Sequence, residues 1–247
     1  MEVTDAARSA LVVGASGAIG SAVTAALLAR ADIDSVHAAS RTPPQDSNTA
    51  SGRLHWHVCD NSEADISRVI AQLQQRGETL TRVVICSGIL HDGDIQPEKA
   101  LERISAASML AVLAANTVTP MLWLAALAQP LRQSPDAVVA ALSARVGSIG
   151  DNRLGGWYSY RASKAALNMA LKTAAIELSR RAPATKLIAF HPGTTDSELS
   201  KPFQARVPAD KLFEPSFVAA RLLTIMDNAR PDGALAYLDW AGEPIPW

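Results

Sequence analysis

The sequence predicts a single α/β domain in which a doubly wound parallel sheet of about seven strands is covered by helices on both faces. Short apolar runs alternate with helical segments of ten or more residues along the whole chain. Glycine, proline or polar turns separate these segments, and no repeat or linker divides residues 1–247. Strands that alternate with helices form right-handed crossovers and therefore pair in parallel.

Each element follows from a local pattern. Strands are expected at 10–13, 36–39, 53–58, 82–86, 137–142, 187–190 and 235–238. Helices are expected at 18–30, 62–76, 109–131, 158–181 and 215–228, the second capped by Ser62 and ended by Gly77. The polar stretch 194–210 follows a strand on the side where such sheets bind ligands. It is either a lid over a substrate or a plain surface loop.

Composition excludes several classes of protein. The formal net charge is −1, which gives no general attraction to nucleic acid or to a membrane surface. Cys59 and Cys86 lie in apolar runs and indicate buried thiols in a reducing compartment, so the expected location is cytoplasmic. The apolar run 109–131 is interrupted by polar residues and Pro120, which favours a buried helix over a membrane span. No histidine pair has metal-ligand spacing near acids or thiols, so no metal is expected.

A glycine-rich turn follows the first strand. Gly14, Gly17 and Gly20 have the spacing Gly-x-x-Gly-x-x-Gly and lead directly into a helix. A dinucleotide pyrophosphate needs a tight turn, close backbone approach and a helix N-terminus aimed at it. The strand-turn-helix context therefore favours a dinucleotide site over a merely flexible turn.

The end of the second strand indicates which dinucleotide is bound. It reads Ala38-Ala39-Ser40-Arg41, without the acid that would bind the ribose diol of NAD. Arg41 can pair with a 2′-phosphate, which favours NADP(H) while leaving NAD(H) possible. The alternative is that Arg41 is a solvated loop residue.

Tyr160 and Lys164 lie one helical turn apart and share a helix face. A cation beside a phenol lowers the pKa of the phenol and makes it a usable proton donor for carbonyl reduction or alcohol oxidation. Upstream, Pro120 frees the carbonyl of Asn116 from its helical hydrogen bond. That carbonyl either holds a water on a proton path toward Lys164 or marks a simple kink.

Together, the glycine turn, Tyr160-x-x-x-Lys164 and Pro192-Gly193 resemble the short-chain dehydrogenase/reductase family. The segment 143–168 is similar to the C-factor-like branch of that family. The resemblance covers nearly the whole chain. It implies a Rossmann fold, an NAD(P)(H) cofactor, a small carbonyl or alcohol substrate, and a homodimer or homotetramer.

The resemblance also assigns roles to individual residues. It implies that Tyr160 is the acid/base, that Lys164 binds the nicotinamide ribose, and that Asn116 belongs to a proton relay. The residues implied in cofactor binding are Gly14, Ser16, Gly17, Ile19, Gly20, Arg41, Asp60, Asn61, Ser87, Gly88, Tyr160, Lys164, Pro192, Gly193 and Thr195.

One departure from the family pattern keeps two functions open. The serine that orients the substrate is replaced by Ala144, so Ser143 is the expected catalytic serine, with Ser148 as another possible donor. An NADP(H)-dependent oxidoreductase that uses Tyr160 is the first hypothesis. A dinucleotide-binding signalling or sensor protein of the C-factor type, with weak or no turnover, is the second. A sugar-nucleotide epimerase is excluded because too little chain follows the sixth strand.

Overall fold

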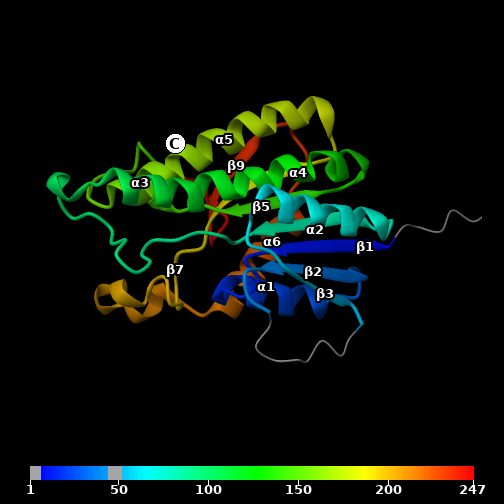
Figure 1. Ribbon diagram of the computed structural model, residues 1–247, viewed down its shortest axis with the longest axis horizontal. Coiled ribbons are helices and arrows are strands. Elements are labelled where there is room, and N and C mark those ends of the chain that lie inside the picture. Colours follow the sequence, from blue (N-terminus) through cyan, green and yellow to red (C-terminus); the bar gives the residue numbers. More distant parts are fainter. Residues whose placement is uncertain (1–6, 44–51) are drawn as a thin grey trace, which may run out of the picture.

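The computed structural model describes residues 7–43 and 52–247. Its centre is a seven-stranded parallel sheet with the order β3-β2-β1-β4-β5-β6-β9 (Figure 1), which confirms the expected fold class. The strands are β1 (Arg8–Val13), β2 (Ser35–Ser40), β3 (Leu54–Val58), β4 (Thr79–Ile85), β5 (Val138–Leu142), β6 (Lys186–His191) and β9 (Leu235–Asp239). The strand order reverses between β1 and β4, and sheets of this kind bind ligands at the carboxyl ends of the strands beside such a reversal.

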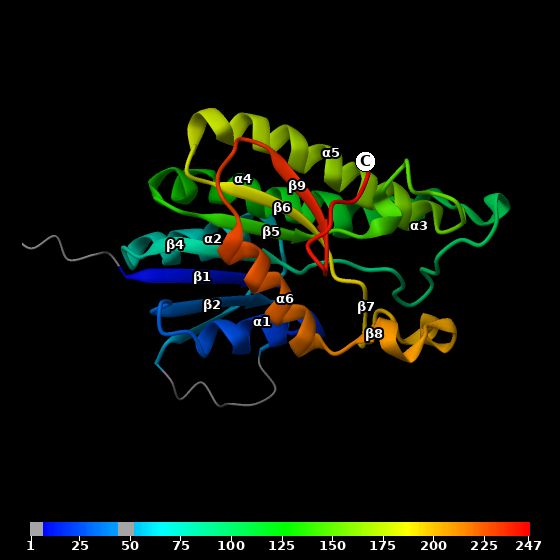
Figure 2. The same ribbon diagram turned by 180° about the vertical axis from the view of Figure 1, so that it is seen from behind.

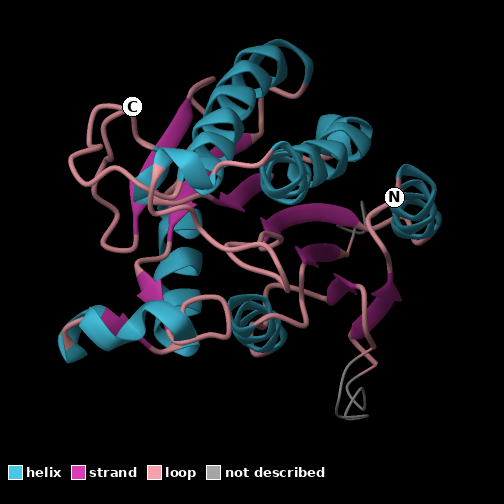
Figure 3. Cartoon of the chain, turned by 60° about the vertical axis from the view of Figure 1, so that its left-hand side comes forward, coloured by secondary structure: helices cyan, strands magenta, loops and turns pink. Residues whose placement is uncertain are grey.

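Helices cover both faces of the twisted sheet (Figure 3). On one face α1 (Ala18–Leu28) packs against α6 (Pro215–Asn228). On the other face α4 (Thr119–Gln133) lies between α2 (Glu63–Gln75) and α5 (Tyr158–Arg181). Successive side chains of a strand point to opposite faces of the sheet, so the strands contribute to two separate cores. In β1, Leu11 and Val13 face one core, and Ala10 and Val12 face the other.

The long apolar helix differs from the expectation. It begins at Ala106 and comprises α3 (Ala106–Leu113), a π-helical turn η2 (Ala114–Val118) and α4. The N–H of Thr119 donates to the carbonyl of Ala114, five residues back, and Pro120 opens α4. The chain therefore accommodates Pro120 by widening one turn instead of kinking. By length and composition the run Ala106–Gln133 is apolar enough to cross a membrane, and 33% of its most apolar window is buried.

Two further regions differ from the sequence-based expectation: the start of β4 and the segment 194–213. β4 begins at Thr79, before the expected start at 82, and pairs with β1 with a register shift between Ser9 and Ala10. The 194–213 segment has structure of its own: β7 (Thr194–Thr195), η4 (Lys201–Arg206), η5 (Ala209–Lys211) and β8 (Leu212–Phe213). Figure 2 shows this segment beyond the carboxyl ends of the sheet strands. The remaining short helices are η1 (Leu101–Arg103) and η3 (Arg145–Gly147).

Candidate active site

The glycine turn joins β1 to α1 in a shape that side chains would prevent. Gly14 has φ +78°, and its N–H donates to the carbonyl of Ala39 at 2.8 Å, tying the turn to β2. A Cβ on Gly20 would lie 2.2 Å from the Gly14 carbonyl oxygen, so only glycine lets α1 begin this close to the turn. Gly17 caps α1 without a side-chain hydrogen bond. The first N–H groups of α1 are thus free of a side-chain cap and suited to an anion.

Other expected cofactor residues lie around this turn. Ser16 is exposed within it, and Ile19 is half-buried against the core of α1 and α6. Arg41 is exposed immediately after β2. Asp60 follows β3, and its Oδ1 accepts the N–H of Ser62 at 2.7 Å.

Asn61 has a structural bond that the sequence did not indicate. Its backbone is left-handed, with φ +69°, and its Oδ1 accepts the indole N–H of the buried Trp123 at 2.9 Å. The side chain therefore fastens the end of β3 to α4 through its oxygen.

Two hydroxyl groups at the carboxyl edge of the sheet support the fit of a dinucleotide. The Oγ of Ser87, after β4, and the Oγ1 of Thr195, after β6, are buried without a hydrogen-bond partner among the described residues. A buried polar atom left without a partner costs about 1–3 kcal/mol, so both hydroxyls are suited to an external ligand. Together with the glycine turn, they form a site that fits a dinucleotide.

Tyr160 and Lys164 lie on the first turns of α5. The Lys164 Nζ is 5.8 Å from the centroid of the Tyr160 ring and donates to the carbonyl of Leu142 at 2.8 Å. Lys164 is buried, with 3% of its surface exposed. A Cβ on Gly88 would lie 3.4 Å from Nζ and 3.0 Å from the Asn116 Oδ1. Gly88 thus allows the strand end, the ammonium and the amide to meet.

The protonation of this pair differs from the expectation. Burial raises the pKa of Tyr160 to about 12, with a smaller contribution from Tyr237, and burial lowers the pKa of Lys164 to about 8. The expected lowering of the Tyr160 pKa by Lys164 is therefore wrong for this structure, because burial desolvates the phenolate and raises the pKa. Near neutral pH, Tyr160 is a protonated phenol.

Asn116 is fixed by three hydrogen bonds from the π-helical turn. Its Oδ1 accepts the N–H of Ile89 at 2.7 Å, and its Nδ2 donates to the Ile89 carbonyl at 2.8 Å and to the Ser163 Oγ at 3.0 Å. Ser163, which is fully buried, donates to the carbonyl of Tyr160 at 2.8 Å. Sequence reasoning missed this link, although Ser163 lies inside the Tyr-x-x-x-Lys run. The water expected on the Asn116 carbonyl remains a prediction.

The expected substitute for the missing serine already has a partner. The Ser143 hydroxyl donates to the Asn168 Oδ1 at 2.6 Å in a buried position. A hydroxyl has one hydrogen to donate, so Ser143 has none left for a substrate oxygen unless this bond breaks. Ala144 beside it is buried, and its carbonyl accepts from the Tyr237 hydroxyl at 2.7 Å. The Ser148 Oγ only accepts, from the N–H of Asp151 at 3.0 Å, and keeps its hydrogen.

Pro192 and Gly193 turn the chain from β6 into the 194–213 segment. Gly193 has φ +74°, and a Cβ there would lie 2.6 Å from the Phe213 ring. Glycine is therefore required for Phe213 to pack at the base of the segment. His191, just before this turn, has a buried Nδ1 without a partner among the described residues, and burial lowers its pKa to about 4.

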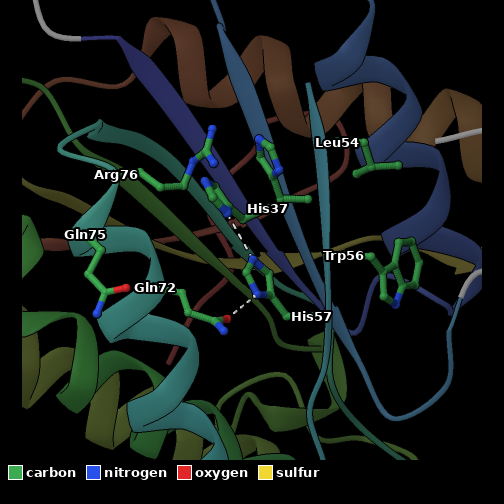
Figure 4. Close-up of a pocket in the computed structure, with 8 residues that line it drawn as sticks. His37, Leu54, Trp56, His57, Gln72, Gln75 and Arg76 are labelled. Carbon is green, nitrogen blue, oxygen red and sulfur yellow. Dashed lines mark hydrogen bonds between the residues drawn. The ribbon is translucent and has the colours of Figure 1, made fainter. Parts of the chain in front are cut away.

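A separate hollow of about 540 Å³ lies on β2 and β3 beside the end of α2 (Figure 4). His37, which lines it, meets His57 at 3.0 Å and donates to Glu78 at 2.8 Å. The Gln72 amide contacts the other side of His57 at 3.0 Å. In the described part of the chain, no three histidine, cysteine or acidic side chains are gathered to hold a metal ion. β2 and β3 end the sheet on the side away from β5 and β6, so this hollow is distinct from the Tyr160 site.

Fold and site together define a Rossmann-type α/β protein with a tyrosine–lysine pair at the carboxyl edge of its sheet. Residues 8–207 match the family model described as short chain dehydrogenase. The chain belongs to this family of oxidoreductases.

Two relatives in sequence point to different roles. The C-signal protein of Myxococcus xanthus is 32% identical over 148 residues, which is 60% of this chain and 84% of that protein. The 1-hydroxy-2-glutathionyl-2-methyl-3-butene dehydrogenase of Rhodococcus sp. (strain AD45) is 28% identical over 240 residues, covering 96% of this chain and 98% of the relative.

Solved structures share the fold at low identity. The NADPH-bound carbonyl reductase from chicken fatty liver has a TM-score of 0.85 at 23% identity and covers 98% of this chain and 95% of its own. An NADP-bound short-chain dehydrogenase/reductase from Burkholderia multivorans has a TM-score of 0.80 at 22% identity. The match covers 98% of this chain and 100% of the Burkholderia chain.

Proposed function

We propose that this protein is an NADP(H)-dependent carbonyl reductase in which Tyr160 protonates the substrate oxygen. The observation that carries the proposal is the meeting of Tyr160, Lys164 and Asn116 at the carboxyl edge of the sheet, where two buried hydroxyls have no hydrogen-bond partner among the described residues. The NADP(H)-bound neighbours of the same fold support this choice of cofactor.

In the proposed mechanism, bound NADPH supplies the hydride. The glycine turn and α1 hold the pyrophosphate, Arg41 pairs with the 2′-phosphate, and the hydroxyls of Ser87 and Thr195 gain their missing partners. The phenol of Tyr160 donates its proton to the carbonyl oxygen of the substrate.

The protonation states favour reduction. Because burial raises the pKa of Tyr160 to about 12, the phenol carries its proton at neutral pH. Lys164, with its pKa lowered by burial to about 8, can return a proton to Tyr160 near neutrality. Asn116 and Ser163 hold the backbone of Tyr160 in place during this exchange. We also propose a cytoplasmic location and a small carbonyl or alcohol compound as the substrate.

The experiment compares two neighbouring phenols. NADPH oxidation is followed by absorbance across a panel of aldehydes and ketones for the wild type, Tyr160→Phe and Tyr158→Phe. We expect Tyr160→Phe to lose nearly all turnover while binding NADPH normally, and Tyr158→Phe to keep its activity. Equal activity of the Tyr160→Phe variant and the wild type would refute the assigned role.

The absence of a hydroxyl at position 144, where the family has a substrate-orienting serine, favours a second function. Ala144 has no hydroxyl, and the Ser143 hydroxyl is committed to Asn168. A dinucleotide-binding signalling or sensor protein of the C-factor type needs no such donor, and the C-signal relative supports this reading. Tight NADPH binding without turnover of any carbonyl in the panel would favour the second function over the first.

A further inference from the structure

The residues just before α5 adopt an unusual backbone. Gly155, Gly156 and Trp157 follow one another with φ values of 62°, 66° and 52°, all left-handed. Glycine adopts this region freely, but a tryptophan there costs on the order of 1–3 kcal/mol. Such strain persists only where surrounding contacts impose it, and it is found mostly at functional positions.

Hydrogen bonds to Glu98 and Arg161 surround the left-handed residues. The carbonyl of Glu98 accepts the N–H of Trp157 at 2.6 Å, and its buried carboxylate accepts from the N–H of Ser159 at 3.1 Å and from the Ser159 hydroxyl. The Arg161 guanidinium donates to the carbonyl of Gly156 at 2.9 Å. The carboxylate also lies at the N-terminus of α5, where negative charge is favoured. The Glu98 carbonyl and the two charged side chains thus hold Trp157 and the residues on either side of it.

The strained backbone places the Trp157 indole between Tyr160 and the 194–213 segment. Its centroid lies 6.2 Å from the Tyr160 ring, edge to face, and 5.1 Å from the Phe203 ring of η4. Phe203 in turn lies 6.0 Å from His91, whose Nε2 contacts the Glu198 carbonyl at 3.1 Å. Three segments distant in sequence therefore bring aromatic rings together beside the phenol.

We propose that Trp157 and Phe203 are specificity-determining residues, which select carbonyl compounds that carry a flat aryl group on the carbonyl carbon. This inference rests on the proposed function and names its substrate class. A flat ring gains stacking or edge-to-face contact with indole and phenyl rings beyond the burial of its area. At the strand end where the family orienting serine would stand, Ala144 presents only a methyl group and the Ser143 hydrogen is already donated. Ring contact therefore adds orientation that neither Ala144 nor Ser143 supplies.

The test uses two aldehydes of similar size and different flatness. The ratio of kcat/KM for benzaldehyde to that for cyclohexanecarbaldehyde is measured for the wild type, Trp157→Leu, Phe203→Leu and the control Phe217→Leu. Comparing ratios between variants cancels the intrinsic reactivity of each aldehyde. Loss of one aromatic contact should lower the ratio roughly threefold to tenfold in the first two variants and leave the control unchanged. An unchanged ratio in both Trp157→Leu and Phe203→Leu overturns the proposal.

A binding measurement separates this inference from the proposed function. Benzyl alcohol and cyclohexylmethanol are titrated calorimetrically into the protein saturated with NADPH, a complex that cannot oxidise either alcohol, so only binding is measured. Preferential binding of benzyl alcohol that is lost in Trp157→Leu and Phe203→Leu supports the aromatic selection even if the wild type reduces neither aldehyde. Equal binding of the two alcohols by the wild type overturns the aromatic selection even if carbonyl reduction is confirmed.

Discussion

The surroundings of Tyr160 keep its phenol protonated. Burial raises the pKa of Tyr160 to about 12 and lowers that of Lys164 to about 8. The proposed proton donor is therefore protonated throughout the neutral range, and the group that titrates first as the pH rises is the ammonium beside it.

This order predicts the pH profile of the reaction. The kcat/KM for carbonyl reduction should be level on the acid side of pH 8 and fall above about 8, as Lys164 loses the charge that we expect to hold the nicotinamide ribose. Alcohol oxidation, which needs a proton acceptor, should instead rise with pH. Both profiles are measured by following NADPH absorbance. A reduction rate that already falls between about pH 6 and 7 would assign the proton to another group, because an unperturbed histidine titrates there.

The strand end at Ala144 makes a second residue-scale prediction. Ala144→Ser should add a hydroxyl that acts on the transition state, raising kcat by about tenfold or more with little change in KM. Ser143→Ala is the matched comparison, and we expect a small effect on kcat because that hydroxyl is bonded to Asn168. Steady-state kinetics on one verified aldehyde decide the matter. A large loss in Ser143→Ala with no gain in Ala144→Ser would restore Ser143 as the orienting donor.

At the scale of elements, β2 and β3 are joined to α2 by buried histidines that are neutral at pH 7. Burial lowers the pKa of His37 from 6.5 to about 4, against the opposing effect of Glu78. Burial opposes charge on Glu78, but hydrogen bonds from His37, Ser35 and Arg76 outweigh it and lower the Glu78 pKa to about 2. The folded protein therefore favours a neutral His37 imidazole and an ionised Glu78 carboxylate at this edge of the sheet.

That arrangement predicts acid sensitivity. Between pH 6.5 and about 4 the unfolded chain binds a proton at His37 that the native protein does not, so stability falls as the pH falls. The full effect corresponds to about 3 kcal/mol. Urea unfolding of the wild type should show this slope, and His37→Gln should reduce it, leaving the part that His191 contributes through its own lowered pKa. His91→Gln, which changes a loop histidine outside the cluster, serves as the control. An identical slope in wild type and His37→Gln would contradict the assignment.

The sequence predicted the elements well where periodicity alone decides them. Alternating strands and helices indicated the seven strands, because buried parallel strands read as short apolar runs. The sequence did not predict features that depend on how one element packs against another. The π-helical turn at Ala114–Val118 depends on how a whole helix absorbs Pro120. The Ser143–Asn168 bond and the high pKa of Tyr160 depend on packing between β5, β9 and α5. The left-handed Trp157 has no local signal beyond the glycines before it.

At the scale of the molecule, α3 and α5 pack together and expose large apolar side chains. Leu110 is 66% exposed and Val118 50%, while on α5 Met169 is 69% exposed and Ile176 49%. In the resembled family such helices form a two-fold interface, and isologous pairing is the commonest oligomer geometry. We therefore expect a homodimer or a homotetramer.

A charge on this surface should separate the subunits. Met169→Glu would bury a carboxylate in the expected interface and lower the oligomer order in light scattering at micromolar concentration. Val58→Glu, which changes a 51% exposed residue on β3 at the far edge of the sheet, should leave the oligomer intact. A wild-type monomer at that concentration would refute the expected assembly.

Hydride transfer under the control of Tyr160 is the central claim, and the mass of the product tests it most directly. The protein is supplied with NADPH deuterated at the transferring position of the nicotinamide and with benzaldehyde, and the alcohol is analysed by mass spectrometry. We expect one deuterium per molecule of product for the wild type and Tyr158→Phe, and nearly no product for Tyr160→Phe. Product without deuterium, or deuterated product formed equally fast by Tyr160→Phe, would contradict it.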